Sequence, residues 1–341
     1  MQFGSERKKK VDVSPTRLVT LEFAPVPDVS VLVVNYNTQH LIDRMMASLA
    51  AGAGNLRLQI IVVDNNSKDE SVALLSARYP EVELIRSEVN LGFGRANNLA
   101  LTKARGRYVL LLNTDAFVGA DALAQTVSFI EQHPRCGVLG VKLVGEDGSL
   151  QPCCRYFPTP WNSFLLRTGL QRLFPDTKMI DDLEWDHAST RACDWVPGCY
   201  YLIRREVIDQ VGLFDPRFFM YSEEVDHCRR VRQAGWEVIF YPHVSVIHLG
   251  GESAKADGTP LDASQQISSL QIESELLYFR KHYGMAGVFT AFFLTFVADG
   301  LTAARHALKR SDLRRARLAL AHAASTMRIL VSTAWATRPT Q

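Results

Sequence analysis

The chain has 341 residues, enough for one large or two ordinary domains, and its 47% apolar and 22% charged residues are typical of a globular protein. A formal net charge of +2 does not favour nucleic-acid binding, and we expect no nucleic-acid partner. The charge is uneven, because residues 300–341 contain eight basic side chains and one acidic side chain.

The six cysteines show neither paired CxxC spacing nor the density of a small secreted scaffold. We therefore expect reduced thiols and a chain that stays in the cytoplasm. Residues 1–28 are polar, include three lysines at 8–10, and lack the apolar stretch of a secretory signal. They predict a flexible N-terminal arm.

Strands and helices are predicted to alternate from residue 29 onward, because short apolar runs alternate with stretches of helical periodicity. The predicted strands are residues 29–34, 59–63, 82–86 and 108–112, and the helices between them are 41–49, 70–79 and 96–104. This alternation implies an α/β domain with a parallel sheet and right-handed crossovers.

The pattern is less regular after residue 115. Residues 152–197, rich in Trp, Arg and Pro, are expected to form a loop-bearing insertion. The remaining predicted elements are helices at 121–133, 205–211 and 223–235, and strands at 137–144, 199–204 and 237–241. We place the end of the domain near residue 255.

Polar loops follow three predicted strands, at the end of an open parallel sheet where ligands bind. They are residues 35–38, 64–67 and 113–115. No GxGxxG or GxxxxGK[ST] motif occurs, which counts against a Rossmann cofactor site and a P-loop. A bound diphosphate would need another partner, such as a divalent metal held by Asp115. Helix capping is the alternative role of Asp115 and Asp64.

The segment NLGFGRANN, residues 90–98, combines glycines with two asparagines at the start of a predicted helix. A plain turn with a helix cap explains this composition. A loop that approaches a phosphate closely, with Arg95 supplying charge, explains it as well.

Seven segments in fixed order resemble family 2 glycosyltransferases of the GT-A fold, and most of all their bacterial rhamnosyltransferase-like branch. The segments are VSVLVVNYNT, IIVVDNNSKDES, VNLGFGRANN, YVLLLNTD, WVPGCYYLIRREVI, GLFDPRFFMYSEEVDHCRR and VIHLGG. The resemblance implies a GT-A domain over residues 29–255, with a nucleotide-binding half at 29–115 and an acceptor-binding half at 116–255. It also implies inverting sugar transfer from a nucleotide-diphosphate donor, assisted by Mg²⁺ or Mn²⁺.

The resemblance assigns the nucleotide and metal contacts. Asp64 matches the acid that contacts the nucleobase. Asn113 and Asp115 occupy the two ends of the family's Asp-x-Asp metal motif, although the founding pattern has Asp at the first position. His248, in V-x-H-x-x-G, resembles a metal ligand, and a histidine that only satisfies its own hydrogen bonds at a strand end is the alternative. The full nucleotide-binding set is Asn35, Tyr36, Asn37, Asp64, Asn66, Asn90, Gly92, Arg95, Asn97 and Asn113.

Three carboxylates follow the apolar run at residues 218–221. Glu224 matches the second member of the family's acid pair and is our choice for the base that takes the acceptor proton, with Glu223 and Asp226 as alternatives. The apolar neighbours are expected to raise a carboxylate pKa. Negative charge in a first helical turn is also favourable without catalysis.

Three further residues are candidates for acceptor binding. Trp195 and Gly198 belong to WVPG, which resembles part of the acceptor side in similar enzymes, and Arg155 is a candidate partner for a phosphate on a lipid carrier. A buried core tryptophan and a surface ion pair are the alternatives for Trp195 and Arg155.

Residues 256–341 are predicted to form a helical, basic region. Its uncharged stretch, residues 285–298, is shorter than the roughly 18–20 residues needed to span a bilayer. Residues 311–335 mix arginines with apolar side chains, which predicts a helix at an anionic membrane surface. Packing on the catalytic domain, or a homo-oligomer, is the alternative.

The resemblance implies an enzyme that transfers L-rhamnose from dTDP-rhamnose, or another sugar from a UDP donor, to a lipid-linked glycan at the inner face of the bacterial cell membrane. A metal-dependent nucleotidyltransferase is an alternative, although the first strand is followed by an Asn-Tyr-Asn loop where that class has glycines. Asn113 keeps open a non-catalytic membrane adaptor.

Overall fold

The computed structural model describes residues 26–181, 185–252, 260–308 and 313–341. The predicted N-terminal arm lies almost wholly outside the described residues, and so does the domain boundary placed near residue 255.

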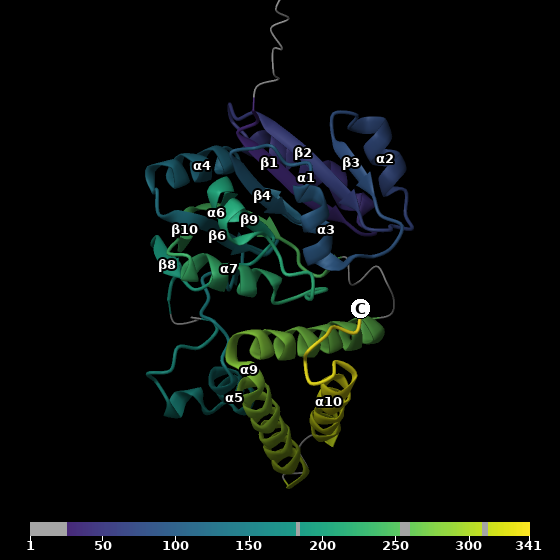
Figure 1. The fold of residues 1–341 in the computed structure, drawn as a ribbon, viewed down its shortest axis with the longest axis vertical. Coiled ribbons are helices and arrows are strands. Elements are labelled where there is room, and N and C mark those ends of the chain that lie inside the picture. Colours follow the sequence, from purple (N-terminus) through teal and green to yellow (C-terminus); the bar gives the residue numbers. More distant parts are fainter. Residues whose placement is uncertain (1–25, 182–184, 253–259, 309–312) are drawn as a thin grey trace, which may run out of the picture.

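One sheet of ten strands organises the chain (Figure 1), in the order β3-β2-β1-β4-β9-β6-β10-β5, with β7 beside β6 and β8 beside β10. The strands are β1 (Val29–Asn35), β2 (Leu58–Asp64), β3 (Glu83–Arg86), β4 (Tyr108–Leu112), β5 (Ala116–Val118), β6 (Cys136–Val144), β7 (Leu150–Gln151), β8 (Arg191–Cys193), β9 (Tyr200–Arg204) and β10 (Glu237–His248).

The sheet is mixed and mainly parallel, as predicted. Strands β1 to β4 run parallel, and β9 is antiparallel to both β4 and β6. Strand β6 is parallel to β10, so the carboxyl ends of β1, β2, β4, β6 and β10 meet at one edge. All five residues of β4 are buried, which explains its unbroken apolar run.

Helices cover the sheet and supply the other half of the core. One face of α1 buries Leu41, Met45 and Leu49, at the spacing of an amphipathic helix. Helix α3 begins four residues earlier than predicted. The helices of this part are α1 (Gln39–Gly52), α2 (Ser71–Arg78), α3 (Gly92–Leu101), α4 (Ala122–Gln132), α6 (Arg205–Val211) and α7 (Glu223–Gln233).

The insertion at residues 152–197 contains more regular structure than its composition predicts. Helix α5 (Pro160–Thr168) is followed by a 3₁₀ turn, η1 (Leu170–Leu173). Thr159 and Asn162 form a reciprocal capping box, and Pro160 occupies the first turn. Residues 159–162 therefore carry a local sequence signal for the start of α5.

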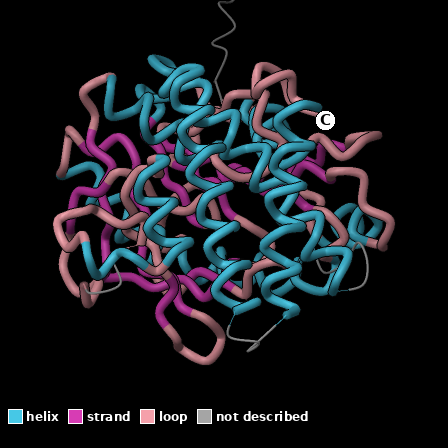
Figure 2. The backbone as a smooth tube through the Cα atoms, turned by 90° about the horizontal axis from the view of Figure 1, so that it is seen from below, coloured by secondary structure: helices cyan, strands magenta, loops and turns pink. Residues whose placement is uncertain are grey.

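The C-terminal region is helical, as predicted. Helix α9 (Pro260–Leu308) bends at Gly284, where φ is 67° and ψ is −162°. Its first part lies under α7, its second part points away from the sheet, and α10 (Leu313–Ser332) returns alongside (Figure 1). Seen from below, these helices lie across the strands (Figure 2). The chain ends back at α9, where the Thr340 backbone N–H donates to the Glu273 carboxylate at 2.8 Å.

Candidate active site

A cavity of about 320 Å³ opens at the carboxyl ends of β1, β2, β4 and β10, beside the first turn of α7. Its position follows from the sheet, because polar loops after parallel strands converge at the same edge. Eight of the residues singled out in the sequence line it. They are Tyr36, Asn90, Asn113, Asp115, Gly198, Glu223, Glu224 and His248.

Strand register brings the two predicted metal ligands together. Ala116 of β5 pairs with His248 of β10 in an antiparallel ladder, and the Leu249 backbone N–H donates to the Asp115 carbonyl at 3.1 Å. The His248 Nε2 therefore lies 3.6 Å from the Asp115 Oδ1. The three residues of β5 thus bring together two side chains that are more than a hundred residues apart in the sequence.

Gln151 orients the imidazole of His248. Its amide Nε2 donates to the His248 carbonyl at 2.8 Å, so its Oε1 faces the His248 Nδ1 at 3.0 Å. Because an amide oxygen only accepts, Nδ1 donates to Gln151 and Nε2 is the ring nitrogen that faces Asp115. This is the usual arrangement behind a metal-ligating histidine. Sequence reasoning missed Gln151, since only the pairing of β7 with β6 brings it here.

The donor set fits a divalent cation that is only partly coordinated by protein. Within the described ranges no group of three or more His, Cys, Asp or Glu side chains could hold a metal. Asp115 and His248 offer one carboxylate and one imidazole, and Asn113 adds a polar group to the same cavity. A mixed oxygen and nitrogen set of this kind suits Mn²⁺ or Mg²⁺ whose remaining ligands are phosphate oxygens.

The two glutamates at the start of α7 face the cavity with unsatisfied carboxylate oxygens. The Oε2 of Glu223 and that of Glu224 are buried and have no hydrogen-bond partner among the described residues. Burial raises the pKa of Glu223 well above its ordinary value, and the charge of Glu224 adds to this. Burial also raises the pKa of Glu224, although a backbone hydrogen bond and the charge of Arg155 oppose it.

A strained turn aims these carboxylates. Tyr221 and Ser222 both have left-handed backbone conformations, with φ of 72° and 65°. Non-glycine residues rarely adopt such angles, which cost of order 1–3 kcal/mol each and occur mainly where a functional group must be positioned.

Comparison with known proteins decides the family. The family model described as "Glycosyl transferase family 2" matches residues 30–228, more than half of the chain. The chain belongs to glycosyl transferase family 2. It is similar to the N-acetylglucosaminyl-diphospho-decaprenol L-rhamnosyltransferase of Mycobacterium tuberculosis, with 27% identity over 84% of this chain and 94% of the relative. It is also similar to the rhamnosyltransferase WbbL of Escherichia coli, with 24% identity over 64% of this chain and 83% of the relative.

The fold of this glycosyltransferase is shared with solved structures. The mannosyltransferase PcManGT from Pyrobaculum calidifontis, in complex with GDP-Man and Mn²⁺, matches with a TM-score of 0.53 and 17% identity, over 97% of this chain and 92% of that chain. The likeness confirms the predicted GT-A fold.

Several predicted nucleotide contacts hold loops of the glycosyltransferase instead of lining the cavity. The Asp64 carboxylate accepts from Asn35 Nδ2 at 3.0 Å and from the Ser67 backbone N–H at 3.2 Å. The Asn37 Oδ1 accepts from the backbone N–H of Lys68 at 2.6 Å. Asn66 lies outside the cavity lining too, with φ of 71°. Asn65, which sequence reasoning passed over, lines the cavity and donates to the Asn90 Oδ1 at 2.8 Å.

The segment at residues 90–98 supports a wall of the cavity. Gly92 has φ of 76°, and a Cβ there would lie 2.1 Å from the Phe219 carbonyl oxygen. Only glycine permits this approach, which lets the Phe93 backbone N–H donate to the same oxygen at 2.8 Å. The Arg95 guanidinium lies 5.5 Å from the Phe219 ring centroid, and Asn97 donates to the Phe93 carbonyl. None of Gly92, Arg95 and Asn97 lines the cavity.

Asp226, the third candidate base, is committed to a different role. Its side chain is fully buried and accepts from Lys281 Nζ at 2.6 Å, His282 Nε2 at 2.8 Å and Arg230 Nε at 2.9 Å. Burial alone would raise its pKa, but the hydrogen bonds from His282 and Lys281 lower the pKa of Asp226 to about 2. Asp226 lies outside the cavity lining and joins α7 to α9.

Two of the three candidate acceptor residues have other partners. Trp195 is buried and donates from Nε1 to the Tyr156 carbonyl at 2.9 Å. Arg155 stacks over the Trp195 ring at 4.4 Å and forms an ion pair with Asp181. These contacts match the alternative roles, a buried core tryptophan for Trp195 and an ion pair for Arg155. Gly198 does line the cavity, against the ring of Phe93.

Replacing Gln151 with leucine should raise the Mn²⁺ concentration needed for half-maximal binding by about 10–100-fold, because the orientation and protonation of His248 would no longer be fixed. Titration of Mn²⁺ by electron paramagnetic resonance, in the presence of a nucleoside diphosphate, measures this. Gln132→Leu on the surface is the matched control, and an unchanged Mn²⁺ affinity in the Gln151 variant would exclude the orienting role.

Proposed function

We propose that this glycosyltransferase transfers L-rhamnose from dTDP-rhamnose to a hydroxyl of a lipid-linked glycan precursor, by direct displacement with inversion. The observation that carries the proposal is one cavity that combines unpartnered Glu224 with the Asp115 and His248 pair. Support for the substrates comes from the mycobacterial relative, whose name specifies rhamnose and a diphospho-decaprenol acceptor and whose length is almost fully covered.

In this mechanism Glu224 takes the proton from the acceptor hydroxyl as that oxygen attacks the sugar. A carboxylate whose pKa is raised by burial is a stronger base than an exposed one. Asp115 and His248 would hold Mg²⁺ or Mn²⁺, and a bound ion supplies positive charge to the leaving diphosphate. Tyr36, Asn65 and Asn113 line the same cavity, and we assign them to the nucleotide.

A donor panel tests the proposal. Purified protein with Mn²⁺ is incubated with dTDP-rhamnose, UDP-N-acetylglucosamine or GDP-mannose, and with N-acetylglucosaminyl diphosphate on a polyprenyl chain. We expect dTDP-rhamnose to raise the melting temperature most and to give a rhamnosylated lipid. Transfer of a different sugar would contradict the donor assignment, and binding of donors without transfer or hydrolysis would favour the non-catalytic adaptor.

We further propose that the second part of α9 and α10 attach the enzyme peripherally to the inner face of the membrane. Exposed phenylalanines at α9 positions 289, 293 and 296 recur at the spacing of one helix face. Exposed Leu320 and Val331 continue the apolar surface on α10, whose exposed arginines suit anionic lipids. Ile329 and Leu330, which lie within the predicted interfacial segment 311–335, are buried and do not belong to this surface.

Helix α9 extends well beyond residues 285–298, the uncharged stretch that is too short to span a bilayer by itself. In the described part of the chain, Ser269–Leu308 is long and apolar enough to cross a membrane by length and composition, with mean hydropathy 1.6 in its most apolar window. Asp299 lies within it and accepts from the His322 Nδ1 of α10 at 2.7 Å. A charged group is costly inside a bilayer, so Asp299 favours the interfacial arrangement.

Replacing Phe289, Phe293 and Phe296 together with serine should weaken binding to anionic vesicles by about a hundredfold, since three apolar side chains would no longer enter the interface. Vesicle co-sedimentation measures this. Serine at Val89 and Leu173, which are exposed elsewhere, provides the control. Equal binding by the wild type and the triple variant would rule out this surface.

A further inference from the structure

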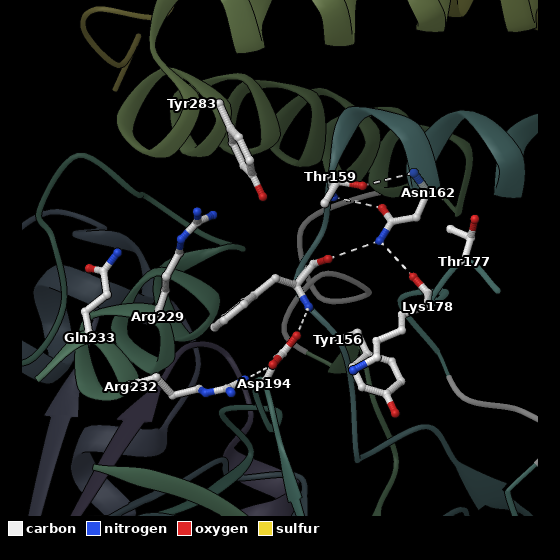
Figure 3. A pocket seen from close by; sticks show the side chains of 11 residues that line it. Tyr156, Thr159, Asn162, Thr177, Lys178, Asp194, Arg229, Arg232, Gln233 and Tyr283 are labelled. Atoms are coloured by element: carbon white, nitrogen blue, oxygen red, sulfur yellow. Dashed lines mark hydrogen bonds and ion pairs between the residues drawn. The ribbon is translucent and has the colours of Figure 1, made fainter. Parts of the chain in front are cut away.

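A second cavity, of about 640 Å³, lies between the insertion, the C-terminal half of α7 and the bend of α9 (Figure 3). Insertion residues 156–178 form one wall, Arg229 and Arg232 of α7 form another, and Tyr283 of α9 completes it. The two cavities share no lining residue. We call the second one the basic cavity.

Positive charge predominates in the basic cavity. Three cationic side chains line it, Lys178, Arg229 and Arg232, against a single carboxylate, that of Asp194. Asp194 is already engaged, because it pairs with Arg232 and accepts from the Phe157 backbone N–H at 2.9 Å. In the described ranges, neither Lys178 nor Arg229 has a carboxylate within ion-pair distance. The excess charge of the basic cavity is therefore available to an anion.

Neutral groups hold the guanidinium of Arg229 in place. It donates to the Tyr278 hydroxyl at 3.0 Å and lies 4.6 Å from the centroid of the Tyr283 ring. In Figure 3, Arg229 and Tyr283 point toward one another from opposite walls. One hydrogen bond uses one of the five guanidinium N–H groups, and a fixed guanidinium is well suited to a phosphate.

The basic cavity lies where the apolar helix face begins. Tyr283 immediately precedes the bend at Gly284, and the exposed phenylalanine face starts five residues after the bend. On α7, Arg229 is five residues beyond Glu224, a rise of about 7.5 Å and a turn of about 140° around the helix axis. A ligand with its sugar at Glu224, its phosphates at Arg229 and its hydrocarbon along α9 would therefore curve around one side of α7.

We propose that the basic cavity binds the diphosphate of a polyprenyl-linked acceptor. Arg229 and Lys178 contact the phosphates, while the hydrocarbon chain leaves along the phenylalanine face of α9. This inference rests on the proposed function for the identity of the sugar, but the site itself requires only a diphosphate attached to a lipid.

Binding to two probes tests the site without any sugar transfer. Full-length protein is titrated with phosphatidylcholine vesicles that carry a long-chain polyprenyl diphosphate, and separately with inorganic pyrophosphate. Arg229→Gln should weaken binding to the diphosphate vesicles by about tenfold or more, since it removes a charged hydrogen bond. Lys178→Gln, at an exposed position that cannot affect folding strongly, should weaken it by about threefold.

Arg135→Gln, at an exposed arginine far along the chain, is the matched control and should bind like the wild type. Retained dTDP binding in each variant shows that the first cavity is intact. Wild-type affinity for the diphosphate vesicles in both the Arg229 and the Lys178 variants would overturn the site. Inorganic pyrophosphate that binds as tightly as the vesicles would overturn the lipid source. Diphosphate binding without rhamnose transfer would instead contradict the proposed function and still support this binding site.

Discussion

Replacing Glu224 with glutamine is expected to lower kcat for sugar transfer by about 10²–10⁴-fold, the usual contribution of a general base. The amide keeps the size of the side chain but cannot accept the acceptor proton. Glu224 is not one of the two predicted metal ligands. The affinity for the donor nucleotide should therefore stay within about twofold of the wild type. Radiolabelled sugar transfer and calorimetric titration of the nucleotide measure the two quantities.

The pH dependence provides an independent readout of the same group. In the wild type, kcat should rise with pH until Glu224 is deprotonated and then level off, at a pH above the ordinary glutamate pKa of 4.5 because burial raises the pKa of Glu224. Since the folded state binds that proton more tightly than the unfolded state, the carboxylate reduces stability as pH rises above 4.5. The glutamine variant should therefore melt no lower than the wild type at neutral pH.

Glu223→Gln is the matched control for the choice of base. It removes a carboxylate of the same cavity, next in sequence, whose pKa is also raised by burial. Loss of turnover in this variant, with normal turnover in Glu224→Gln, would transfer the role of base to Glu223.

Replacing Asp115 with asparagine is expected to weaken Mn²⁺ binding in the presence of donor nucleotide by at least about a hundredfold and to reduce transfer accordingly. The substitution removes the only carboxylate of the predicted pair, and the imidazole of His248 remains alone 3.6 Å from an uncharged amide. Mn²⁺ electron paramagnetic resonance measures the metal directly, so the result does not depend on turnover.

Asp121→Asn, at an exposed position six residues along the chain, controls for the loss of one negative charge. His248→Ala should weaken Mn²⁺ binding by less than Asp115→Asn, because it removes a neutral ligand. Unchanged Mn²⁺ affinity in the Asp115 variant would show that the metal, if used, is held elsewhere.

The sequence predicts strands β1 to β4 well because its signals there are local. Apolar runs of five to seven residues are buried as β1, β2 and β4, and the polar residues after them reach the expected edge. The nucleobase contact of Asp64 stays a prediction, because an acid at a strand end can hold its own loop as well as contact a ligand. Its carboxylate accepts from Asn35 Nδ2 and from the Ser67 backbone N–H, contacts that strand periodicity alone does not reveal.

Contacts between distant segments account for what the sequence could not supply. Nothing near Asp226 in sequence shows that Lys281 and His282, more than fifty residues later, will hold its carboxylate. Likewise, β5 has three residues and no periodic pattern, yet its pairing with β10 places Asp115 beside His248. Gln151 depends on the pairing of β7 with β6, and the basic cavity depends on the folded insertion, whose composition shows no regular period.

The return of the chain end to α9 determines where a purification tag can be attached. Thr340 contacts the buried Glu273 carboxylate, and the neighbouring Ser274 hydroxyl donates to the Met220 carbonyl at 2.7 Å, in the segment that leads to Glu223. A purification tag fused after Gln341 would begin one residue beyond this contact, and we expect it to disturb the wall of the active-site cavity. An affinity tag before Met1 leaves the contact between Thr340 and Glu273 unchanged and is the safer choice for measuring turnover.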